Sequence, residues 1–325
     1  MPLPVKLKSF AEALFHDAGG LAAARWLRRG GLRILMYHRF ADRAGLERQC
    51  AHLRRHYVPL SLGEVAARLE ARRPFPPLAV AVTVDDGYRD AAEVAQPVFA
   101  AYGIPATVFV VTRFLDGGFW LWGDRVLYAC LHAARDAAHV EWPSGEVLAL
   151  DLRDAARRRQ SASLVKERAK RLPTAQCLEL VERLPGLLGC ELPPEPPPEL
   201  AAMSWDDARR LAGSSIEIGS HTLTHPILSR LRSAADLEHE LAASRGRIEE
   251  QLDRECPHFC YPNGRRADIG PRAAAAARAA GYRTAVTTET GLIYPGADPF
   301  DLRRIGVETT YPDAYFARCA AAFRV

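Results

Sequence analysis

Short hydrophobic runs alternate along the chain with longer amphipathic stretches. Several runs are continuously hydrophobic, which is typical of strands buried on both faces of a parallel sheet. The predicted strands are residues 33–39, 57–62, 79–86, 106–112, 216–220, 257–261, 282–288 and 302–308. The clearest helical patterns lie between them, at residues 45–56, 61–72, 90–102, 233–252 and 267–280. This alternation predicts an α/β protein with a parallel sheet, and seven or eight strands favour a closed or partly closed barrel over an open sheet.

One long segment, residues 116–202, interrupts this alternation. It separates two predicted strands by far more than a usual loop. It contains Trp120 and Trp122, a basic stretch at residues 153–171, and the proline-rich sequence LPPEPPPEL at residues 192–200. We predict an insertion of helices and a hairpin that caps the strand ends, with the proline run as a stiff connector.

Composition narrows the class of protein. The chain has 325 residues, of which 48% are hydrophobic and 25% charged, which is ordinary for a globular protein. The net charge of +4 is too small and too dispersed to indicate a nucleic-acid partner. Seven scattered cysteines suggest reduced thiols and a cytoplasmic location. Cys256 and Cys260 flank His258, but the spacing fits no common zinc pattern, so we interpret them as buried strand thiols.

Residues 1–30 form an N-terminal segment that precedes one domain at residues 31–325. Within it, residues 10–29 have the pattern of an amphipathic helix. We favour a helix packed on the domain over one lying on a membrane surface, and the second alternative would allow peripheral association with the inner face of the membrane. The chain shows neither the hydrophobic core of a secretory signal nor a run of about 18 apolar residues.

Reactive side chains gather where the predicted strands end. The carboxyl ends of parallel barrel strands meet at one face, which is where active sites of such barrels are built. Scattered structural histidines would have no reason to share this placement. The residues at strand ends are His38, Asp85, Asp86, His221, His225, Tyr261, Pro262 and Asn263.

The sequence HTLTH is a candidate metal site. His221 and His225 are four residues apart, and on a helical turn both rings would reach one ion. Asp86 can supply a carboxylate, which leaves coordination positions for water and substrate. The pattern HxxxH alone is a weak signal, but its position directly after a predicted strand strengthens it.

The adjacent acids Asp85 and Asp86 are predicted to have different roles. Successive strand residues point to opposite faces, but Gly87 lets the chain turn at once, so both carboxylates can face the mouth of the barrel. One can then bind a metal while the other takes a proton from water. The alternative for this Asp-Asp-Gly sequence is a turn or a helix cap.

Taken together, these motifs resemble those of the polysaccharide deacetylases, carbohydrate esterase family four. TVDDG is similar to the family's TFDDG signature, and HTLTH to its H-[ST]-x-x-H motif, over roughly residues 33–308. The resemblance implies a distorted TIM-like (β/α)7–8 barrel with a helical insertion. It also implies Asp85 as general base and Asp86, His221 and His225 as ligands of a divalent metal. Zinc is the default ion, with cobalt, nickel or iron as alternatives.

The sequence departs from the family at its R-x-P-Y motif. Cys260-Tyr261-Pro262-Asn263 aligns with it, so the arginine that orients the catalytic Asp is replaced by Cys260. We expect Arg304, in a later strand, to substitute for it. The backbone N–H near Asn263 could still stabilise an oxyanion, because that role needs a main-chain donor.

The family's last motif ends in a histidine that acts as general acid. The C-terminal strand here contains none, but the first strand reads Leu-Met-Tyr-His and ends at His38. This arrangement fits a circularly permuted relative, in which His38 lies across the metal from Asp85; the alternative is a structural histidine. Trp120 and Trp122 are candidates either for stacking on a sugar or for the core of the insertion.

The expected function is a metal-dependent hydrolase that removes N-acetyl groups from N-acetylhexosamine units of a polysaccharide, an oligosaccharide or a lipid-linked glycan precursor. Bacterial exopolysaccharide or cell-envelope glycan biosynthesis would be its setting. The alternatives are an amidase or deformylase acting on another C–N bond, and a carbohydrate-binding barrel with little turnover. The sequence indicates neither a nucleic-acid partner nor an obligate protein partner.

Overall fold

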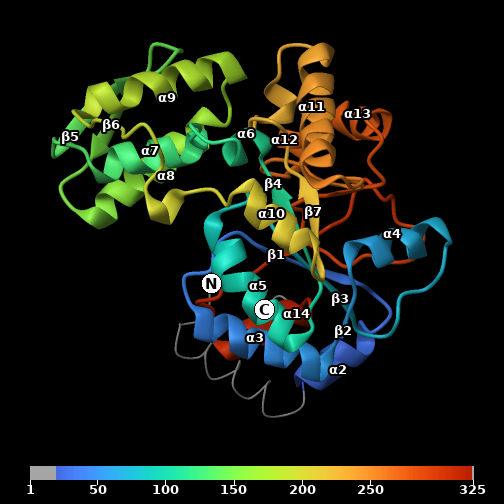
Figure 1. The fold of residues 1–325 in the computed structure, drawn as a ribbon. Helices are drawn as coiled ribbons and strands as arrows, with labels where there is room; N and C mark the ends of the chain where they lie inside the picture. The colour runs from blue at the N-terminus through green and yellow to red at the C-terminus, as the bar shows by residue number, and fades with distance from the viewer. Residues whose placement is uncertain (1–19, 324–325) are drawn as a thin grey trace.

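A single parallel sheet forms the centre of the molecule. The computed structural model describes residues 20–323, and within them the strands of this sheet are β1 (Arg33–Tyr37), β2 (Val58–Pro59), β3 (Ala79–Val84), β4 (Ala106–Val110), β7 (Ile216–Ser220), β8 (His258–Cys260), β9 (Thr284–Val286) and β10 (Ile305–Gly306). They follow the order β10-β1-β3-β4-β7-β8-β9, with β2 paired to β3. Every pair is parallel, and the sheet curls with helices around it (Figure 1). The prediction of a parallel, barrel-like α/β fold is confirmed.

The two ends of the sheet are tied together by a single bridge. Leu302 pairs with Val286 of β9, and three residues later β10 pairs with β1. The segment between β9 and β10 therefore links both edges of the curled sheet. Strands β9 and β10 are shorter than predicted because regular pairing is limited to these few residues.

The predicted strand at residues 57–62 is also longer than the observed one. Only Val58 and Pro59 pair with β3. The Ser61 hydroxyl accepts from the Glu64 N–H, and the Glu64 carboxylate accepts from the Ser61 N–H, which begins helix α4 (Leu62–Glu70). This capping box stops the strand early because it fixes the first helical turn there.

Helices surround the sheet on both sides, and most begin close to their predicted positions. The predicted helix at residues 267–280 is divided in two, because Gly270 adopts a left-handed φ of +75° and Pro271 cannot continue the helix. A π-helical turn at Ala91–Ala95 precedes α5. Besides α4, the helices packed around the sheet are α2 (Gly20–Leu27), α3 (Arg43–His56), α5 (Gln96–Tyr102), α10 (Trp205–Ala212), α11 (Ala234–Leu252), α12 (Arg266–Ile269), α13 (Ala273–Ala279) and α14 (Asp313–Ala320).

Hydrophobic side chains cover both faces of the sheet. Leu35 and Val82 belong to one cluster, whereas their neighbours Ile34 and Ala81 belong to another on the opposite face. Burying a side chain such as Leu35 stabilises the fold by about 1.5–3 kcal/mol. This burial on both sides explains why the strand sequences are continuously hydrophobic.

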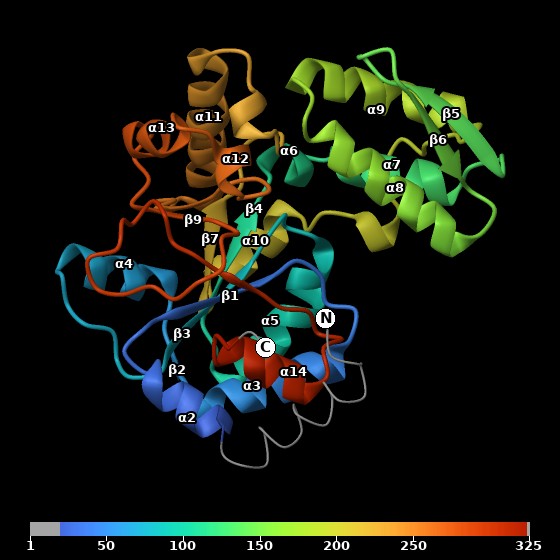
Figure 2. The same cartoon turned by 180° about the vertical axis from the view of Figure 1, so that it is seen from behind.

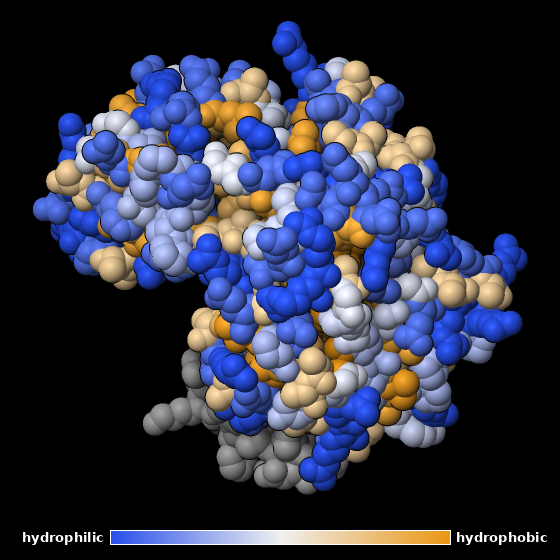
Figure 3. Space-filling view, in the orientation of Figure 1, coloured by the Kyte–Doolittle hydropathy of each residue, from blue (hydrophilic) through white to orange (hydrophobic). Residues whose placement is uncertain are grey.

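The insertion forms a lobe with its own core. Helix α6 (Thr112–Leu115) precedes it. The insertion contains α7 (Trp122–Leu131), the antiparallel hairpin of β5 (Ala137–Glu141) and β6 (Val147–Asp151), α8 (Ala155–Ala169) and α9 (Thr174–Leu188). Val126, Val165 and Leu184 are fully buried in this core. Figures 2 and 3 show the lobe standing beside the sheet domain, and its outer surface is largely hydrophilic.

The N-terminal segment is described only from Gly20 onward, so most of the predicted helix at residues 10–29 lies outside the described residues. In α2, Leu21 and Ala24 pack against Ala317 and Ala321 at the C-terminal end of the chain. The described part of the segment therefore packs on the domain. Among the helices of residues 20–323, none combines the length and apolarity needed to cross a bilayer.

Candidate active site

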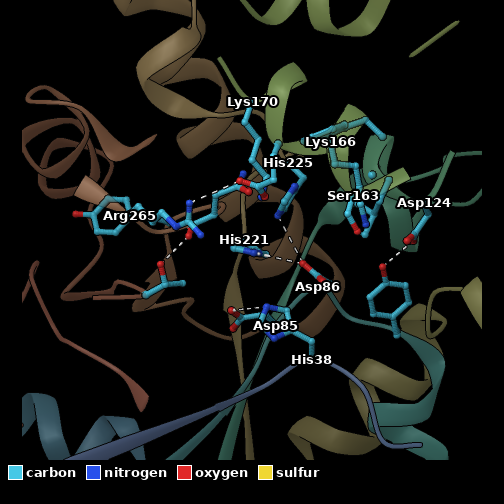
Figure 4. Close-up of a pocket in the computed structure, with 18 residues that line it drawn as sticks. His38, Asp85, Asp86, Asp124, Ser163, Lys166, Lys170, His221, His225 and Arg265 are labelled. Atoms are coloured by element: carbon cyan, nitrogen blue, oxygen red, sulfur yellow. Dashed lines mark hydrogen bonds and ion pairs between the residues drawn. The ribbon is translucent and has the colours of Figure 1, made fainter. Parts of the chain in front are cut away.

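The chain turns sharply where β3 ends. Asp86 has a left-handed φ of +74° and Gly87 follows with +83°. The turn begins one residue earlier than predicted, because aspartate tolerates the left-handed region that most residues avoid. As a result the carboxylates of Asp85 and Asp86 both line the same pocket (Figure 4).

Asp86 lies between two imidazole rings. Its Oδ1 is 3.4 Å from Nε2 of His221 and 3.6 Å from Nε2 of His225. One ligand atom from each residue lies within 4.8 Å of the other two. The three residues follow β3 and β7, which lie on either side of β4 in the sheet, so the carboxyl ends of these parallel strands bring them to the same face.

The HTLTH sequence is a loop, and the expectation of a helical turn is wrong. Thr222 and His225 have φ values of +72° and +60°, which no right-handed helix allows. The Thr222 hydroxyl accepts from the His225 N–H at 3.0 Å, which tightens the loop. The centroids of the two histidine rings are 4.7 Å apart. The rings lie close together because the loop reverses direction, not because they share one face of a helix.

Glu240 on α11 holds this loop in place, and sequence reasoning did not identify it. Its carboxylate accepts from the backbone N–H groups of Leu223 (2.9 Å) and Thr224 (3.0 Å) and from the Thr224 hydroxyl (2.5 Å). Glu240 is buried on the same stripe of α11 as Leu237 and Leu241. The sequence did contain a signal for Glu240, since it lies on the apolar face of a predicted helix. A glutamate that is buried there needs a hydrogen-bonding or charged partner.

We expect Glu240→Ala to weaken metal binding by about 10–100-fold, because a positioning contact of the ligand loop would be lost. Glu238→Ala, on the exposed face of the same helix, is the matched control and should leave affinity unchanged. The dissociation constant for Zn²⁺, measured by competition with a chelator, checks this expectation. Equal affinities in both variants would show that Glu240 does not organise the site.

A hydrogen bond orients the His221 ring so that its Nε2 atom can bind a metal. Its Nδ1 lies 2.8 Å from the carbonyl oxygen of Cys260. A carbonyl only accepts, so Nδ1 carries a proton and Nε2 is the atom that faces Asp86. Burial lowers the pKa of His221, but Cys260 and Asp86 outweigh it and raise the pKa well above its usual value, so a metal would take the place of the Nε2 proton. Burial, together with the neighbouring His221, lowers the pKa of His225 to about 4, so this ring is neutral at pH 7.

A carboxylate and two imidazoles converging on one point form a donor set that fits a divalent ion such as Zn²⁺. Three protein ligands also match the catalytic type of zinc site, in which one position stays open for water or substrate. Asp86, His221 and His225 are therefore the residues that would hold a metal. The other group of possible ligands, Asp85 with His221 and Cys260, is already engaged by Arg304.

Arg304 binds Asp85 through both guanidinium nitrogens. NH1 donates to Oδ1 at 2.6 Å and NH2 donates to Oδ2 at 2.7 Å. The remaining N–H groups donate to Thr83 Oγ1, to the Thr287 carbonyl and to the sulfur of Cys260. Arg304 thus contacts both Asp85 and Cys260, the residue that aligns with the arginine of the R-x-P-Y motif.

This ion pair is fully enclosed, which determines the charge of Asp85. Burial on its own would raise the pKa of the Asp85 carboxyl, but the charge and the two hydrogen bonds of Arg304 outweigh it and hold the pKa below its usual value. Asp85 is therefore ionised at neutral pH. Its orientation is also restrained, because a bidentate pair resists rotation of the carboxylate.

His38 lies on the opposite side of the acids from the two histidine ligands (Figure 4). Its Nε2 is 3.7 Å from Asp85 Oδ2, and 47% of its side chain is exposed. It follows β1, which pairs with β3, so the sheet brings it beside Asp85 from a distant part of the chain. His38 is free to face a bound substrate.

The segment after β8 contributes a backbone N–H group to the pocket, and the Tyr261 hydroxyl is not available for catalysis. Tyr261 is buried, and its hydroxyl donates to the carbonyl of Phe300 at 3.1 Å, so the side chain belongs to the core. The Pro262 carbonyl accepts from the Gly264 N–H in a tight turn. Asn263, with φ of +57°, lines the pocket, and within residues 20–323 its backbone N–H has no acceptor. This N–H is the candidate oxyanion donor.

The pocket has a volume of about 610 Å³, and the insertion supplies much of its wall. Sequence reasoning missed this contribution except for Trp122, because nothing in the pattern showed which insertion residues face the sheet domain. Trp122 packs in the core of the insertion, as one alternative predicted, and it also lines the pocket, so that stacking on a sugar stays a prediction. The insertion residues in the wall are Leu121, Trp122, Gly123, Asp124, Ser163, Lys166, Glu167 and Lys170.

Asp124 is one of two acidic residues in this wall, with Glu167. The Tyr88 hydroxyl donates to Asp124 Oδ2 at 2.6 Å, which ties the insertion to the turn after β3. Burial raises the pKa of Asp124 to about 6, against the hydrogen bond from Tyr88 that lowers it. A carboxyl group that changes charge near neutral pH therefore faces the same pocket as Asp86.

Comparison with known proteins agrees with this geometry. The family model of the polysaccharide deacetylases matches residues 72–140 and 195–285, which include Asp85, Asp86 and the HTLTH loop. The gap between the two stretches falls inside the insertion. The chain belongs to the polysaccharide deacetylase family. His38 and Arg304 lie outside both matched stretches, in parts of the chain that come before and after them.

Solved deacetylases share the fold. The deacetylase PplD of Streptococcus pyogenes, solved with acetate, is 16% identical with a TM-score of 0.59, and the match covers 89% of this chain and 98% of that one. IcaB from Ammonifex degensii is 18% identical with a TM-score of 0.54, covering 90% and 97%. The deacetylase domain of BpsB from Bordetella bronchiseptica is 17% identical with a TM-score of 0.54, covering 86% and 96%. No curated protein matches the chain.

Proposed function

We propose that this protein is a metal-dependent N-deacetylase that releases acetate from N-acetylhexosamine units of a glycan, with zinc as its ion. The observation that carries the proposal is the convergence of a metal-binding triad, an oriented carboxylate and an exposed histidine in one pocket. Membership of the polysaccharide deacetylase family supports the same reaction class. Glycan synthesis for an exopolysaccharide or the cell envelope is the setting that we propose.

The triad would hold the ion, and when bound the ion supplies a Lewis acid that polarises the amide carbonyl and acidifies water. Asp85, kept ionised by Arg304, accepts the proton of the attacking water. The Asn263 N–H donates to the oxygen on which negative charge develops. His38, in its protonated form, donates to the departing nitrogen, so the products are acetate and a free amino sugar.

The division of roles follows from the surroundings of the two proton-transfer groups. Asp85 is buried and held against an arginine, which keeps it an acceptor at neutral pH. His38 is exposed to the pocket and can exchange its proton with solvent. A low pKa makes Asp85 a weak base toward ordinary water, so the scheme requires water that has been acidified in the site.

Acetate and formate release from matched N-acetylated and N-formylated chitooligosaccharides tests the proposal. We expect the zinc-loaded protein to release acetate, and His225→Ala to release none because a metal ligand is lost. Release of formate alone would favour the deformylase alternative. Sugar binding without any release by zinc-loaded protein would favour a carbohydrate-binding barrel.

A further inference from the structure

A second pocket opens beside the active site, between the insertion and the sheet domain. Its volume is about 320 Å³, within the range of small-molecule sites. Its lining is mainly apolar and includes Phe119, Trp120, Leu172, Leu178 and Ile227. No part of the proposed deacetylation uses this pocket, so it needs a separate explanation.

The two pockets adjoin each other. Trp122 and His225 line both of them. Because His225 belongs to the metal-binding triad, the apolar pocket begins directly at the candidate catalytic centre. A ligand whose sugar lies in the larger pocket would therefore have room for a further group in the smaller one.

The C-terminal part of α8 lies along the junction of the pockets and presents a different chemistry to each. Lys166 and Lys170 line the larger pocket, as Figure 4 shows above the triad. Ala169 and Leu172, from the same part of the chain, line the apolar pocket. Cationic groups therefore lie where a ligand would pass from one pocket into the other.

The positive charge at this junction is only partly neutralised by the protein. Lys170 Nζ lies 2.6 Å from Glu167 Oε1, and Arg265 NH1 lies 3.8 Å from Glu167 Oε2. One carboxylate thus faces two cations. Within residues 20–323 Lys166 forms no ion pair, although Asp124 lies in the same wall. In this part of the wall, Lys166, Lys170 and Arg265 carry three positive charges against two negative ones when Glu167 and Asp124 are both ionised. Asp268, which does not line the pocket, also acts on Lys170 and Arg265.

We propose that the substrate is an N-acetylated sugar joined through a phosphate or diphosphate to an apolar chain, with the anionic linkage at Lys166 and Lys170 and the chain in the apolar pocket. The chemistry favours phosphate because it joins two groups while keeping its negative charge, whereas a carboxylate ends a chain. This inference rests on the proposed deacetylase function and names its substrate class.

Binding of n-decyl phosphate, in the presence of a chelator so that no ion can attract the phosphate, tests the two subsites without any activity. Inorganic phosphate and decanol are the comparison ligands, and tryptophan fluorescence is the readout because Trp120 and Trp122 line the apolar pocket. We expect decyl phosphate, below its micelle concentration, to bind at least about tenfold more tightly than either comparison ligand.

Variants separate the two subsites. Leu178→Glu places a charge in the apolar pocket, and Lys166→Met removes the unpaired cation; each should weaken decyl phosphate binding by about tenfold or more. Leu178 is 52% exposed, so its substitution should not disturb folding. Leu164→Glu and Arg159→Met, at exposed positions of α8 outside both pockets, are the matched controls and should bind as the original protein does.

Decyl phosphate binding no tighter than inorganic phosphate would overturn the proposal, and so would unchanged binding in either Leu178→Glu or Lys166→Met. A second assay compares kcat/KM for a free N-acetylated oligosaccharide and for a decyl phosphodiester of N-acetylglucosamine. Equal values in the zinc-loaded protein would contradict the substrate class while leaving the deacetylase function intact. Binding of decyl phosphate without acetate release from either substrate would instead contradict the deacetylase function.

Discussion

Asp85→Asn is expected to lower kcat by about 10²–10⁴-fold, the range for removing a general base. The amide cannot accept the proton of the attacking water, yet it keeps the shape of the carboxylate and one oxygen that can accept from Arg304. Metal affinity should change little, because Asp86, His221 and His225 are left in place. Rates of acetate release, together with zinc content of the purified variant, check both parts.

Asp301→Asn is a suitable control for that experiment. Its Oδ2 accepts from Arg266 at 2.7 Å on the exposed surface, outside the pocket. It should keep the kcat of the original protein. A kcat for Asp85→Asn within a few-fold of the original would show that another group takes the proton.

Arg304→Met should cause the largest loss of stability, about 3–5 kcal/mol, because it leaves the Asp85 charge buried without its partner. It should also change the pH profile. Without Arg304, only the smaller effects of His38 and His221 would oppose the rise in the pKa of Asp85 caused by burial. The acid limb of kcat/KM should therefore move to higher pH, and activity should fall more at pH 6 than at pH 8. Denaturant unfolding and a kcat/KM profile measure the two effects.

The sign of the stability change with pH follows from the same ion pair. Asp85 has a lowered pKa in the folded protein, so the pair stabilises the fold above the unfolded pKa of about 3.9, and this contribution disappears as pH falls through the lower folded value. The loss caused by Arg304→Met should therefore be complete at neutral pH. It should shrink in acid, where Asp85 becomes protonated in both proteins.

Arg33→Met provides a matched control, because Arg33 is also fully buried in the sheet. Its guanidinium donates to the carbonyl groups of Ala320 and Gly31, at the opposite end of β1 from His38. This variant should lose stability without any movement of the acid limb. An unmoved acid limb in Arg304→Met as well would show that Arg304 has only a structural role.

The sheet and the positions of Asp85, Asp86, His221 and His225 could be predicted because they depend on local patterns. Hydrophobic runs mark the strands, and parallel strands place their carboxyl ends at one face. Arg304 was predicted as a substitute on the same basis, from its place in the last strand. The structure places its guanidinium against Asp85.

Other parts of the site depend on contacts between residues far apart in the chain, which the hydrophobic and polar pattern of the sequence does not reveal. The bend of the HTLTH loop requires left-handed conformations at Thr222 and His225, which β-branched and bulky residues seldom adopt, so the expected helical turn was wrong. Glu240 acts on backbone N–H groups of a loop far away in sequence. Lys166 reaches the pocket only because the insertion folds back over the strand ends, and its sequence does not show this placement.

Reconstitution of chelated protein with Zn²⁺ tests the central claim most directly. We expect acetate release from an N-acetylated glycan to be absent without metal and to rise in proportion to occupancy until one ion is bound per chain. Asp86→Ala should lose both the stoichiometric ion and the activity. Acetate release by metal-free protein, or a tightly bound ion in Asp86→Ala, would contradict the account.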